Sequence, residues 1–302
     1  MNFAPEFSID HPCFKQVDSA RRSLMPSLES QTFSQSNAPA AIARRWWRLP
    51  WDFTATVGAF AYWGVAGLLI TAISIPLMIT LPCGTAKRLG RSMLHRAFRV
   101  FVGYLRATDL VQADLSSLNA LKSQTGPVII APNHTSLWDA VFVISKLPQP
   151  ICIMKESILC NPFLGGGARL AGYIPNGSSS GMIKAAAAAL ENSGQLLLFP
   201  EGTRTRREAR WINPLRGGCA LIARRANVPV RPVFIRSNTR FLEKGWPLWR
   251  KPEFPIRISI ELGEPVIPRE NESAHDFTKR LESIYVENLS RAHKLRRQVE
   301  GE

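Results

Sequence analysis

Apolar runs and amphipathic stretches alternate from residue 107 to the end of the chain. Short apolar runs predict buried strands, and longer stretches with apolar residues three or four positions apart predict helices between them. This alternation predicts an α/β fold in which helices flank a central mixed, largely parallel sheet. The expected strands are Val128–Ala131, Ile151–Met154, Gln195–Phe199, Val230–Ile235 and Ile256–Leu262. The expected helices are Leu137–Lys146, Pro162–Ala171, Ser179–Asn192, Leu215–Ala226 and Ala274–Leu295.

The helix expected near the C-terminus has one apolar face, while the N-terminal residues show no periodic pattern of apolar positions. Residues 1–43 are rich in Ser, Gln, Asn and Pro, which is typical of a flexible leader. The apolar face of the last helix consists of Phe277, Leu281, Ile284, Tyr285, Leu289 and Ala292.

Residues 53–86 contain no charged side chain, and residues 55–81 are almost wholly apolar. About 20 apolar residues in a helix span a bilayer core, so this stretch predicts a membrane anchor. A buried core helix is the alternative, and the length of the stretch argues against it. The segment starts too late and runs too long for a secretory signal. Pro76 and Pro82 are expected to kink or end the helix, which leaves a re-entrant hairpin open as a second form of the anchor. An interfacial aromatic belt is indicated by Trp46, Trp47, Trp51, Tyr62 and Trp63.

A basic amphipathic stretch, residues 87–106, follows the apolar segment. Two interpretations are open: the helix lies in the headgroup layer beside the membrane segment, or it packs its apolar stripe on the globular domain and leaves its charges in solvent. The apolar stripe consists of Leu94, Phe98, Phe101 and Leu105. The bases around it are Arg88, Arg91, His95, Arg96 and Arg99.

The formal net charge of +15 is concentrated in the middle of the chain. Residues 1–43 carry −1 and residues 271–302 are neutral, so residues 44–270 carry +16. A field of this sign attracts phosphates, whether of nucleic acid, an anionic membrane or a phosphorylated cofactor. The apolar segment argues against nucleic acid, as does the lack of aromatic residues among the basic runs.

The five cysteines are scattered and no pair has CxxC spacing. This pattern predicts neither a zinc site nor a disulfide framework, and it favours reduced thiols in a cytosol-facing protein. The cysteines are Cys13, Cys83, Cys152, Cys160 and Cys219.

The first candidate site follows the first expected strand, Val128–Ala131. His134 stands just past the strand end, where a short turn holds it, and a neutral imidazole near pH 7 is a natural general base. Asp139, five positions on, is expected to reach back and fix the tautomer of His134. Asn133 braces the turn, and Thr135 or Ser136 caps the following helix. Taken alone, the His134–Asp139 pair has an alternative interpretation, a cluster of polar side chains at the surface that caps a helix.

The second candidate site, residues 199–205 (FPEGTRT), also ends an expected strand. Gly202 permits a tight turn, and Arg204 presents a planar fork that can take a phosphate bidentately. Glu201 orients Arg204 or accepts a substrate hydroxyl. Open α/β sheets bind ligands beyond the carboxyl ends of their strands. The two segments together therefore predict an acid–base site that faces an anionic substrate, although the second segment alone is typical of a solvated loop.

The segments NHTSLWD (133–139) and FPEGTRT resemble the first and third signature blocks of the glycerolipid acyltransferase family. This family contains the 1-acylglycerol-3-phosphate acyltransferases and related lysophospholipid acyltransferases. The resemblance covers roughly residues 107–262, and further matching segments are Lys155-Glu156 with Asn161–Phe163, Leu215–Gly218 and Val228–Val233. Together with the patterns above, it divides the chain into four expected parts: a flexible leader over 1–43, a membrane anchor with a basic amphipathic helix over 44–106, an acyltransferase domain over 107–270 and an amphipathic helix over 271–302.

The resemblance also implies a mechanism. His134, oriented by Asp139, removes the proton of an acceptor hydroxyl, and the oxygen attacks the carbonyl carbon of an acyl thioester. The donor is acyl-CoA or acyl carrier protein, the acceptor is a lysolipid such as 1-acylglycerol-3-phosphate, and no metal or other cofactor takes part. Arg204 binds the acceptor phosphate. The enzyme is expected in the inner (cytoplasmic) membrane, with its catalytic domain facing the cytosol. The implied substrate-binding residues are Asn133, Glu201, Gly202, Thr203 and Arg204.

One segment departs from the family pattern. The family's second block has a glycine and apolar residues followed shortly by an arginine that helps to bind glycerol phosphate. The matching residues 172–178 (GYIPNGS) contain no arginine, and none lies between Arg169 and Arg204. Arg169 or Lys184 is the candidate replacement. Without one, the acceptor is expected to be another lysolipid, an amino-acid lipid or a polyketide-like alcohol.

Two other function classes compete with acyl transfer. A non-catalytic basic protein that binds membranes would account for the charge and would not need His134. A hydrolase is disfavoured because Ser136 lies only two residues from His134, and because Gly177–Gly181 (GSSSG) lacks the spacing of a GxSxG nucleophile elbow.

Overall fold

The computed structural model describes residues 48–177, 179–247, 250 and 252–300. All of them belong to one unit of the chain. The leader expected over residues 1–43, together with Cys13, Trp46 and Trp47, lies outside the described residues.

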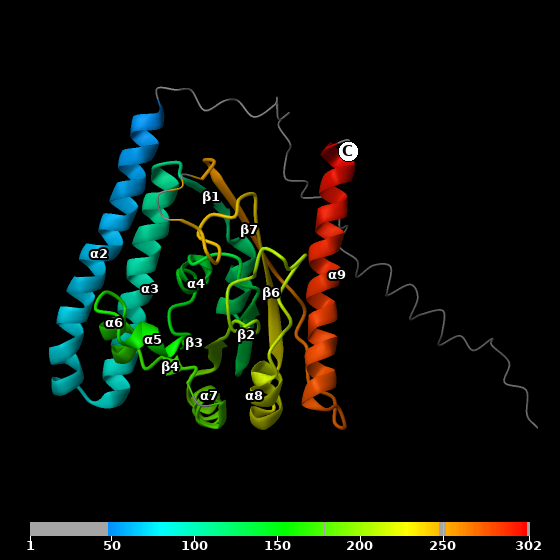
Figure 1. Ribbon diagram of the computed structural model, residues 1–302. Coiled ribbons are helices and arrows are strands. Elements are labelled where there is room, and N and C mark those ends of the chain that lie inside the picture. Colours follow the sequence, from blue (N-terminus) through cyan, green and yellow to red (C-terminus); the bar gives the residue numbers. More distant parts are fainter. Residues whose placement is uncertain (1–47, 178, 248–249, 251, 301–302) are drawn as a thin grey trace, which may run out of the picture. The chain divides into compact units, whose positions relative to one another are not determined.

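A seven-stranded sheet forms the centre of this unit (Figure 1). The strand order is β1-β7-β6-β2-β5-β3-β4, and every neighbouring pair is parallel except β6 and β7. The expected mixed, largely parallel sheet is therefore confirmed. The pattern of apolar runs did not indicate the two short edge strands β1 and β4. The strands are β1 (Val111–Asp114), β2 (Val128–Pro132), β3 (Ile151–Met154), β4 (Ile174–Pro175), β5 (Gln195–Leu197), β6 (Val230–Ser237) and β7 (Ile256–Leu262).

Strand β2 runs through the middle of the sheet, and all five of its residues are buried. It pairs with β5, where Val128 faces Gln195, and with β6, where Ile129 faces Val230. A strand that is covered on both faces needs apolar side chains on both sides, which explains the unbroken run that predicted it. Because β2, β5 and β6 are parallel, the loops after their carboxyl ends leave the sheet at the same edge.

Helices cover both faces of the sheet (Figure 1). The side chains of β2 alternate between two hydrophobic cores, with Val128 and Ile130 in one and Ile129 and Ala131 in the other. The first core is closed by η2, α3 and α4, and the second by α7, α8 and α9. The helices of the α/β layers are η2 (Ser116–Lys122, a 3-10 helix), α4 (Asp139–Ile144), α5 (Glu156–Leu159), α6 (Gly165–Leu170), α7 (Ser179–Ser193), α8 (Gly218–Ala226) and α9 (Ala274–Glu300).

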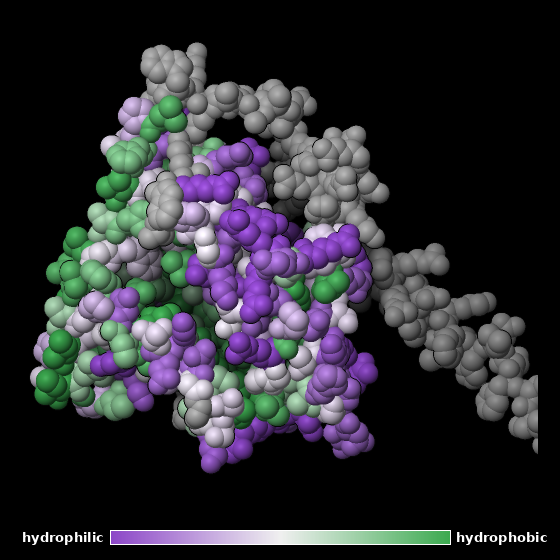
Figure 2. All heavy atoms as spheres, in the orientation of Figure 1, coloured by the Kyte–Doolittle hydropathy of each residue, from purple (hydrophilic) through white to green (hydrophobic). Residues whose placement is uncertain are grey.

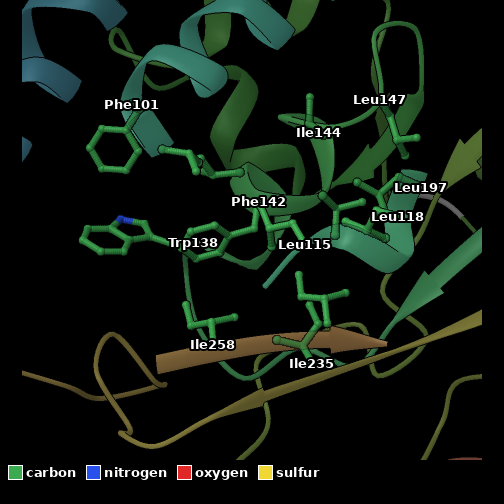
Figure 3. Close-up of a cluster of buried hydrophobic side chains, with 14 of the residues drawn as sticks. Phe101, Leu115, Leu118, Trp138, Phe142, Ile144, Leu147, Leu197, Ile235 and Ile258 are labelled. Carbon is green, nitrogen blue, oxygen red and sulfur yellow. The ribbon is translucent and has the colours of Figure 1, made fainter. Parts of the chain in front are cut away.

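The first core joins the segment after β2 to helix α3 (Cys83–Ala107) (Figure 3). Phe101 of α3 meets Trp138 edge to face, with ring centroids 5.3 Å apart. Ile258 of β7 belongs to the same cluster. These contacts hold the segment that carries His134 against the first core.

The second core holds α9 against the sheet. Phe277, Leu281 and Tyr285 are each at most 1% exposed, so the apolar face that the sequence predicted for this helix packs as expected. The Tyr285 hydroxyl also donates a hydrogen bond to the carbonyl oxygen of Ala131 in β2.

Helix α2 (Leu49–Thr80) is the one described helix that is long and apolar enough to cross a membrane. Large apolar side chains on it are exposed, among them Phe53 (69%) and Ile79 (80%), and hydrophobic residues gather along this helix in Figure 2. Small residues, Ala55 and Ala59, are buried instead. The helix thus exposes much of its apolar surface, while Tyr62, Trp63 and Ile70 pack against the first core.

The uncharged stretch of residues 53–86 is divided between two helices at Pro82, one of the two prolines that were expected to kink or end the helix. Helix α2 ends at Thr80, and residues 83–86 begin α3, so the two helices form a hairpin. Pro82 precedes the first residue of α3, where its fixed φ and missing N–H suit a helix start. Pro76 lies inside α2.

The apolar stripe of α3 packs on the α/β layers. Phe101 and Leu105 are fully buried, Leu94 is 7% exposed, and Phe98 packs against the same core. Of the two interpretations that the sequence left open, the structure shows the stripe on the globular core. Bases such as Arg96 remain exposed.

Two glycines bring α2 close to α6 and to the loop before it. A Cβ on Gly67 would lie 2.3 Å from the carbonyl oxygen of Phe163, and a Cβ on Gly166 would lie 2.6 Å from Cα of Thr71. Only a residue without a side chain permits such an approach.

Candidate active site

The loops after β2 and β5 are bonded directly to one another. The backbone N–H of His134 donates to Oε1 of Glu201 at 2.8 Å. The backbone N–H of Thr205 donates to the carbonyl oxygen of His134. The two segments that the sequence singled out therefore form one site at the carboxyl edge of the sheet.

His134 and Asp139 form the hydrogen bond that their spacing led us to expect. Nδ1 of His134 lies 3.0 Å from Oδ2 of Asp139. The carboxylate is 1% exposed, whereas the imidazole is 18% exposed and can be reached from solvent. When the carboxylate accepts the Nδ1 proton, Nε2 is left as the basic nitrogen of the neutral ring. The ring also stacks on Phe199, with centroids 4.0 Å apart.

The carboxylate of Asp139 also holds the turn that precedes it. It accepts the backbone N–H of Ser136 at 2.7 Å and the hydroxyl of Thr135 at 3.3 Å. Helix α4 begins at Asp139, and its N-cap is Trp138 without a side-chain capping bond. The expectation that Thr135 or Ser136 caps this helix was therefore wrong, because the acidic side chain binds the turn instead.

Asn133 connects the end of β2 to β6. Its Nδ2 donates to the carbonyl oxygen of Ile235 at 3.0 Å, and its Oδ1 accepts the N–H of Ile235 at 2.7 Å. The side chain is buried, with 1% exposure of the residue. Asn133 thus holds the strand end that carries His134, as a brace of the turn would.

Glu201 is buried and its carboxylate accepts hydrogen bonds from three parts of the site. Besides His134 N–H, it accepts the N–H of Asn213 at 2.8 Å and the hydroxyl of Thr205 at 2.9 Å. Burial raises the pKa of this carboxyl group, and the hydrogen bonds from His134 and Asn213 oppose that shift. The observed contacts of Glu201 are therefore with the protein framework rather than with Arg204.

Gly202 makes the tight turn that was expected of it. Its φ is +66°, and its N–H donates to the carbonyl oxygen of Phe199 at 3.0 Å. A Cβ at this position would lie 2.6 Å from Cδ of Arg216. Thr203, the next residue, is half-buried in the same loop.

Arg204 is half-buried and is held by a third loop. Its Nη1 donates to the carbonyl oxygens of Leu242 at 2.7 Å and of Glu243 at 3.1 Å. Burial lowers the pKa of Arg204, and the negative charge of Asp139 opposes this shift.

The third loop follows β6, and the sequence motifs did not reveal it. The hydroxyl of Ser136 donates to the carbonyl oxygen of Phe241 at 3.1 Å, so Ser136 is bonded to this loop. The N–H of Leu137 donates to the carbonyl oxygen of Leu242 at 3.2 Å. The parallel pairing of β6 with β2 was the signal that could have located the loop at this edge.

Over the described ranges, no three or more His, Cys, Asp or Glu side chains are grouped as metal ligands would be.

Arg169 and Lys184 are the candidate replacements for the arginine of the family's second block. Both are exposed, Arg169 on α6 and Lys184 on α7.

Comparison with known proteins places this site in context. Residues 114–236 match the family model described as Acyltransferase, and this range contains His134, Asp139 and residues 201–205. The chain is 28% identical over 178 residues to the 1-acyl-sn-glycerol-3-phosphate acyltransferase of Limnanthes douglasii, which covers 55% of this chain and 60% of that protein.

A bacterial relative and a solved structure are also similar. The chain is 31% identical over 148 residues to the 1-acyl-sn-glycerol-3-phosphate acyltransferase of Streptococcus pneumoniae (strain ATCC BAA-255 / R6), covering 45% of this chain and 54% of that protein. The chain thus spans less than two thirds of the length of either curated relative. The fold is similar to the crystal structure of the 1-acyl-sn-glycerophosphate (LPA) acyltransferase PlsC from Thermotoga maritima, with a TM-score of 0.61 at 18% identity over 80% of this chain and 96% of that chain.

Proposed function

We propose that the protein transfers a fatty acyl group from an acyl thioester to a lysolipid hydroxyl, on the premise that residues 114–236 match the family model described as Acyltransferase. The donor is acyl-CoA or acyl carrier protein, and the acceptor is 1-acylglycerol-3-phosphate, the substrate in the names of its relatives. The observation that carries the proposal is the His134–Asp139 hydrogen bond, in a loop that Glu201 and Thr205 tie to the FPEGTRT segment.

In the proposed reaction, Nε2 of His134 takes the proton of the acceptor hydroxyl as its oxygen attacks the thioester carbonyl carbon. The C–O bond forms, the C–S bond breaks, and the leaving thiolate takes the proton back from the imidazolium. Asp139 holds the ring in the tautomer that leaves Nε2 basic, and it stabilises the imidazolium. The products are an ester and a free thiol, so no acyl-enzyme and no cofactor beyond the two substrates is needed.

Arg204 is proposed to bind the acceptor phosphate. A guanidinium has five N–H donors, and the two hydrogen bonds seen for Arg204 in the described part of the chain both start from Nη1. The donors on Nε and Nη2 are therefore the ones that a phosphate would take. The carbonyls of Leu242 and Glu243 fix the plane of the fork before the substrate arrives.

Helix α2 supports a membrane location for the protein. Such a location suits the proposed acceptor, because a lysolipid resides in the bilayer. We place the protein in the inner (cytoplasmic) membrane with the α/β layers on the cytosolic side, where an acyl thioester is made available. The free cysteines fit a reducing compartment; Cys83 and Cys160 are exposed, and Cys152 and Cys219 are buried.

The test is a transfer assay on the purified full-length chain in detergent micelles. Acyl-CoA and acyl carrier protein are offered as donors against a panel of lysolipids, and product ester is measured. We expect transfer to 1-acylglycerol-3-phosphate, and its loss in His134→Ala at unchanged thermal unfolding. His275→Ala, which changes an exposed histidine on α9, is the matched control. Retained transfer in His134→Ala would overturn the proposed base.

A second acceptor class is kept because no arginine lies between Arg169 and Arg204. The same panel includes an amino-acid lipid and a polyketide-like alcohol. Transfer to one of these with none to 1-acylglycerol-3-phosphate would replace the acceptor while leaving the acyl-transfer chemistry in place. Binding to anionic vesicles without transfer to any acceptor would favour a non-catalytic membrane protein.

A further inference from the structure

A large cavity lies at the edge of the sheet opposite to His134. Its volume is about 1080 Å³, and its wall comes from α3, η2, the segment after α4 and the connection between α7 and β5. A cavity of this size suits an organic molecule rather than a single ion. The residues of its wall that carry charge or titrate are His95, Arg99, Arg106, Lys122, Lys146 and Glu191.

The cavity is separate from the site at His134. It is lined by Pro127, just before β2, and by Gln195, the first residue of β5, whereas His134 and Glu201 follow the other ends of these strands. At about 3.3 Å per residue, the seven residues from Pro127 to His134 put roughly 20 Å between the two places.

The charge of the cavity wall is strongly unbalanced. Four permanent cations stand against one carboxylate, that of Glu191. Burial lowers the pKa of Lys146, and the positive charges of Arg106, Lys122 and Arg99 lower it further, while the negative charge of Asp114 opposes the shift. Arg99, Arg106 and Lys122 are exposed and Lys146 is half-buried, so like charges gather along an open wall, where a bound anion would relieve their repulsion.

One acid outside the wall offsets part of this charge. Asp114 acts on Lys146 and Arg106, and the hydrogen bonds that its Oδ1 accepts from the N–H and hydroxyl of Ser116 lower its pKa. No ion pair is seen for the four cations within the described ranges; Arg106 donates to the carbonyl oxygen of Ala113.

The wall also has apolar and hydrogen-bonding parts. Val102, Leu147 and Leu190 line it beside the cations. Nδ1 of His95 is bonded to the carbonyl oxygen of Ile144 at 2.8 Å, which orients this ring at the cavity. A ligand that combines phosphate groups with an organic body would therefore meet both kinds of surface.

We propose that this cavity is a second ligand site, independent of the transfer reaction, that binds an organic phosphate through Arg99, Arg106, Lys122 and Lys146. The phosphate belongs either to a molecule free in solution or to the headgroup of an anionic lipid, since α3 pairs with the membrane helix α2 in the hairpin. Both sources present the same chemistry to these four cations.

Two probes distinguish the sources on the full-length protein in detergent micelles. Inorganic pyrophosphate represents a soluble phosphate, and short-chain phosphatidylglycerol represents an anionic headgroup, with short-chain phosphatidylcholine as its zwitterionic reference. Binding is measured by titration calorimetry for wild type, for Lys122→Gln/Lys146→Gln and for Arg224→Gln/Arg225→Gln. The last pair removes two exposed bases from α8 and matches the change in net charge.

We expect the Lys122→Gln/Lys146→Gln variant to bind at least one probe about tenfold more weakly than wild type. The α8 variant and His134→Ala should bind as wild type does. A loss confined to pyrophosphate identifies a soluble ligand, and a loss confined to phosphatidylglycerol identifies a headgroup. Lys122→Arg/Lys146→Arg should restore binding, which a folding defect would not allow. Equal affinity of wild type and the Gln variant for both probes, or no saturable binding by wild type, would overturn the proposal.

Discussion

The backbone N–H of His134 donates a 2.8 Å hydrogen bond to the buried carboxylate of Glu201, which lies 67 residues further along the chain. The same carboxylate accepts the N–H of Asn213 and the hydroxyl of Thr205. A single buried acid thus joins the loop of the proposed base to the loop of the proposed phosphate ligand. The position of the imidazole relative to Arg204 depends on this joint.

Replacing Glu201 with glutamine should loosen that joint. The amide keeps one acceptor oxygen but turns an NH₂ group toward backbone donors, so a buried N–H loses its partner. We expect the free energy of unfolding to fall by about 1–3 kcal/mol, and transfer to fall with it. Denaturant unfolding in detergent measures the first and the acyl-transfer assay the second. Glu208→Gln, at an exposed glutamate in the same loop, is the control and should change neither.

The raised pKa of Glu201 gives this stability a pH dependence of known sign. Burial makes the folded state hold its proton above the ordinary glutamate value of 4.5. Between that value and the raised pKa, the folded state binds more protons than the unfolded state, so stability falls as pH rises. The stability difference between wild type and Glu201→Gln should therefore shrink with rising pH across this window. A difference that grows instead would mean that the hydrogen bonds outweigh burial.

Asp139→Asn should keep the fold and lose the reaction. Oδ2 of Asp139 contacts both the N–H of Ser136 and Nδ1 of His134. An asparagine oxygen in the place of Oδ2 can keep both bonds, but the amide carries no negative charge to stabilise the imidazolium. We expect kcat to fall about 10²- to 10⁴-fold at nearly constant acceptor KM. The double variant His134→Ala/Asp139→Asn should be no slower than His134→Ala. Additive losses would show that Asp139 acts by another route.

Arg204→Lys should weaken acceptor binding. Nη1 of the guanidinium bonds two carbonyls while its other nitrogens remain for a phosphate, and an ammonium group at one point cannot serve both. We expect the KM for 1-acylglycerol-3-phosphate to rise roughly tenfold with little change in donor KM. Arg206→Lys, at the exposed arginine two residues on, is the control. An unchanged acceptor KM in Arg204→Lys would remove the proposed phosphate contact.

The sheet, most helices and the two signature segments could be predicted from the sequence, because each buried strand is an unbroken run of apolar residues. The loop after β6 has no such pattern. Its contacts with Arg204 and Ser136 are made by carbonyl oxygens of Phe241, Leu242 and Glu243, and every residue type has one. No motif marks a backbone acceptor, so only the pairing of β6 with β2 places this loop at the site.

The structural role of Glu201 was hidden for a related reason. A polar residue after a strand suggests a group that faces a ligand, and the family resemblance implied that Glu201 belongs to the acceptor site. Its three donors are the backbone N–H groups of His134 and Asn213 and the hydroxyl of Thr205. Only the folded chain shows that these donors converge and bury the carboxylate.

Two glycines on α2 provide a matched test of how this helix is attached. A Cβ at Gly67 would lie 2.3 Å from the carbonyl oxygen of Phe163, which is backbone and cannot swing away, while a Cβ at Gly64 would meet nothing within 4 Å. Gly67→Ala should therefore destabilise the protein by about 1–3 kcal/mol, since α2 must move off the loop before α6. Gly64→Ala should leave stability unchanged or raise it by up to about 1 kcal/mol, through helix propensity. Thermal unfolding in micelles compares them, and equal midpoints would show that the hairpin is held elsewhere.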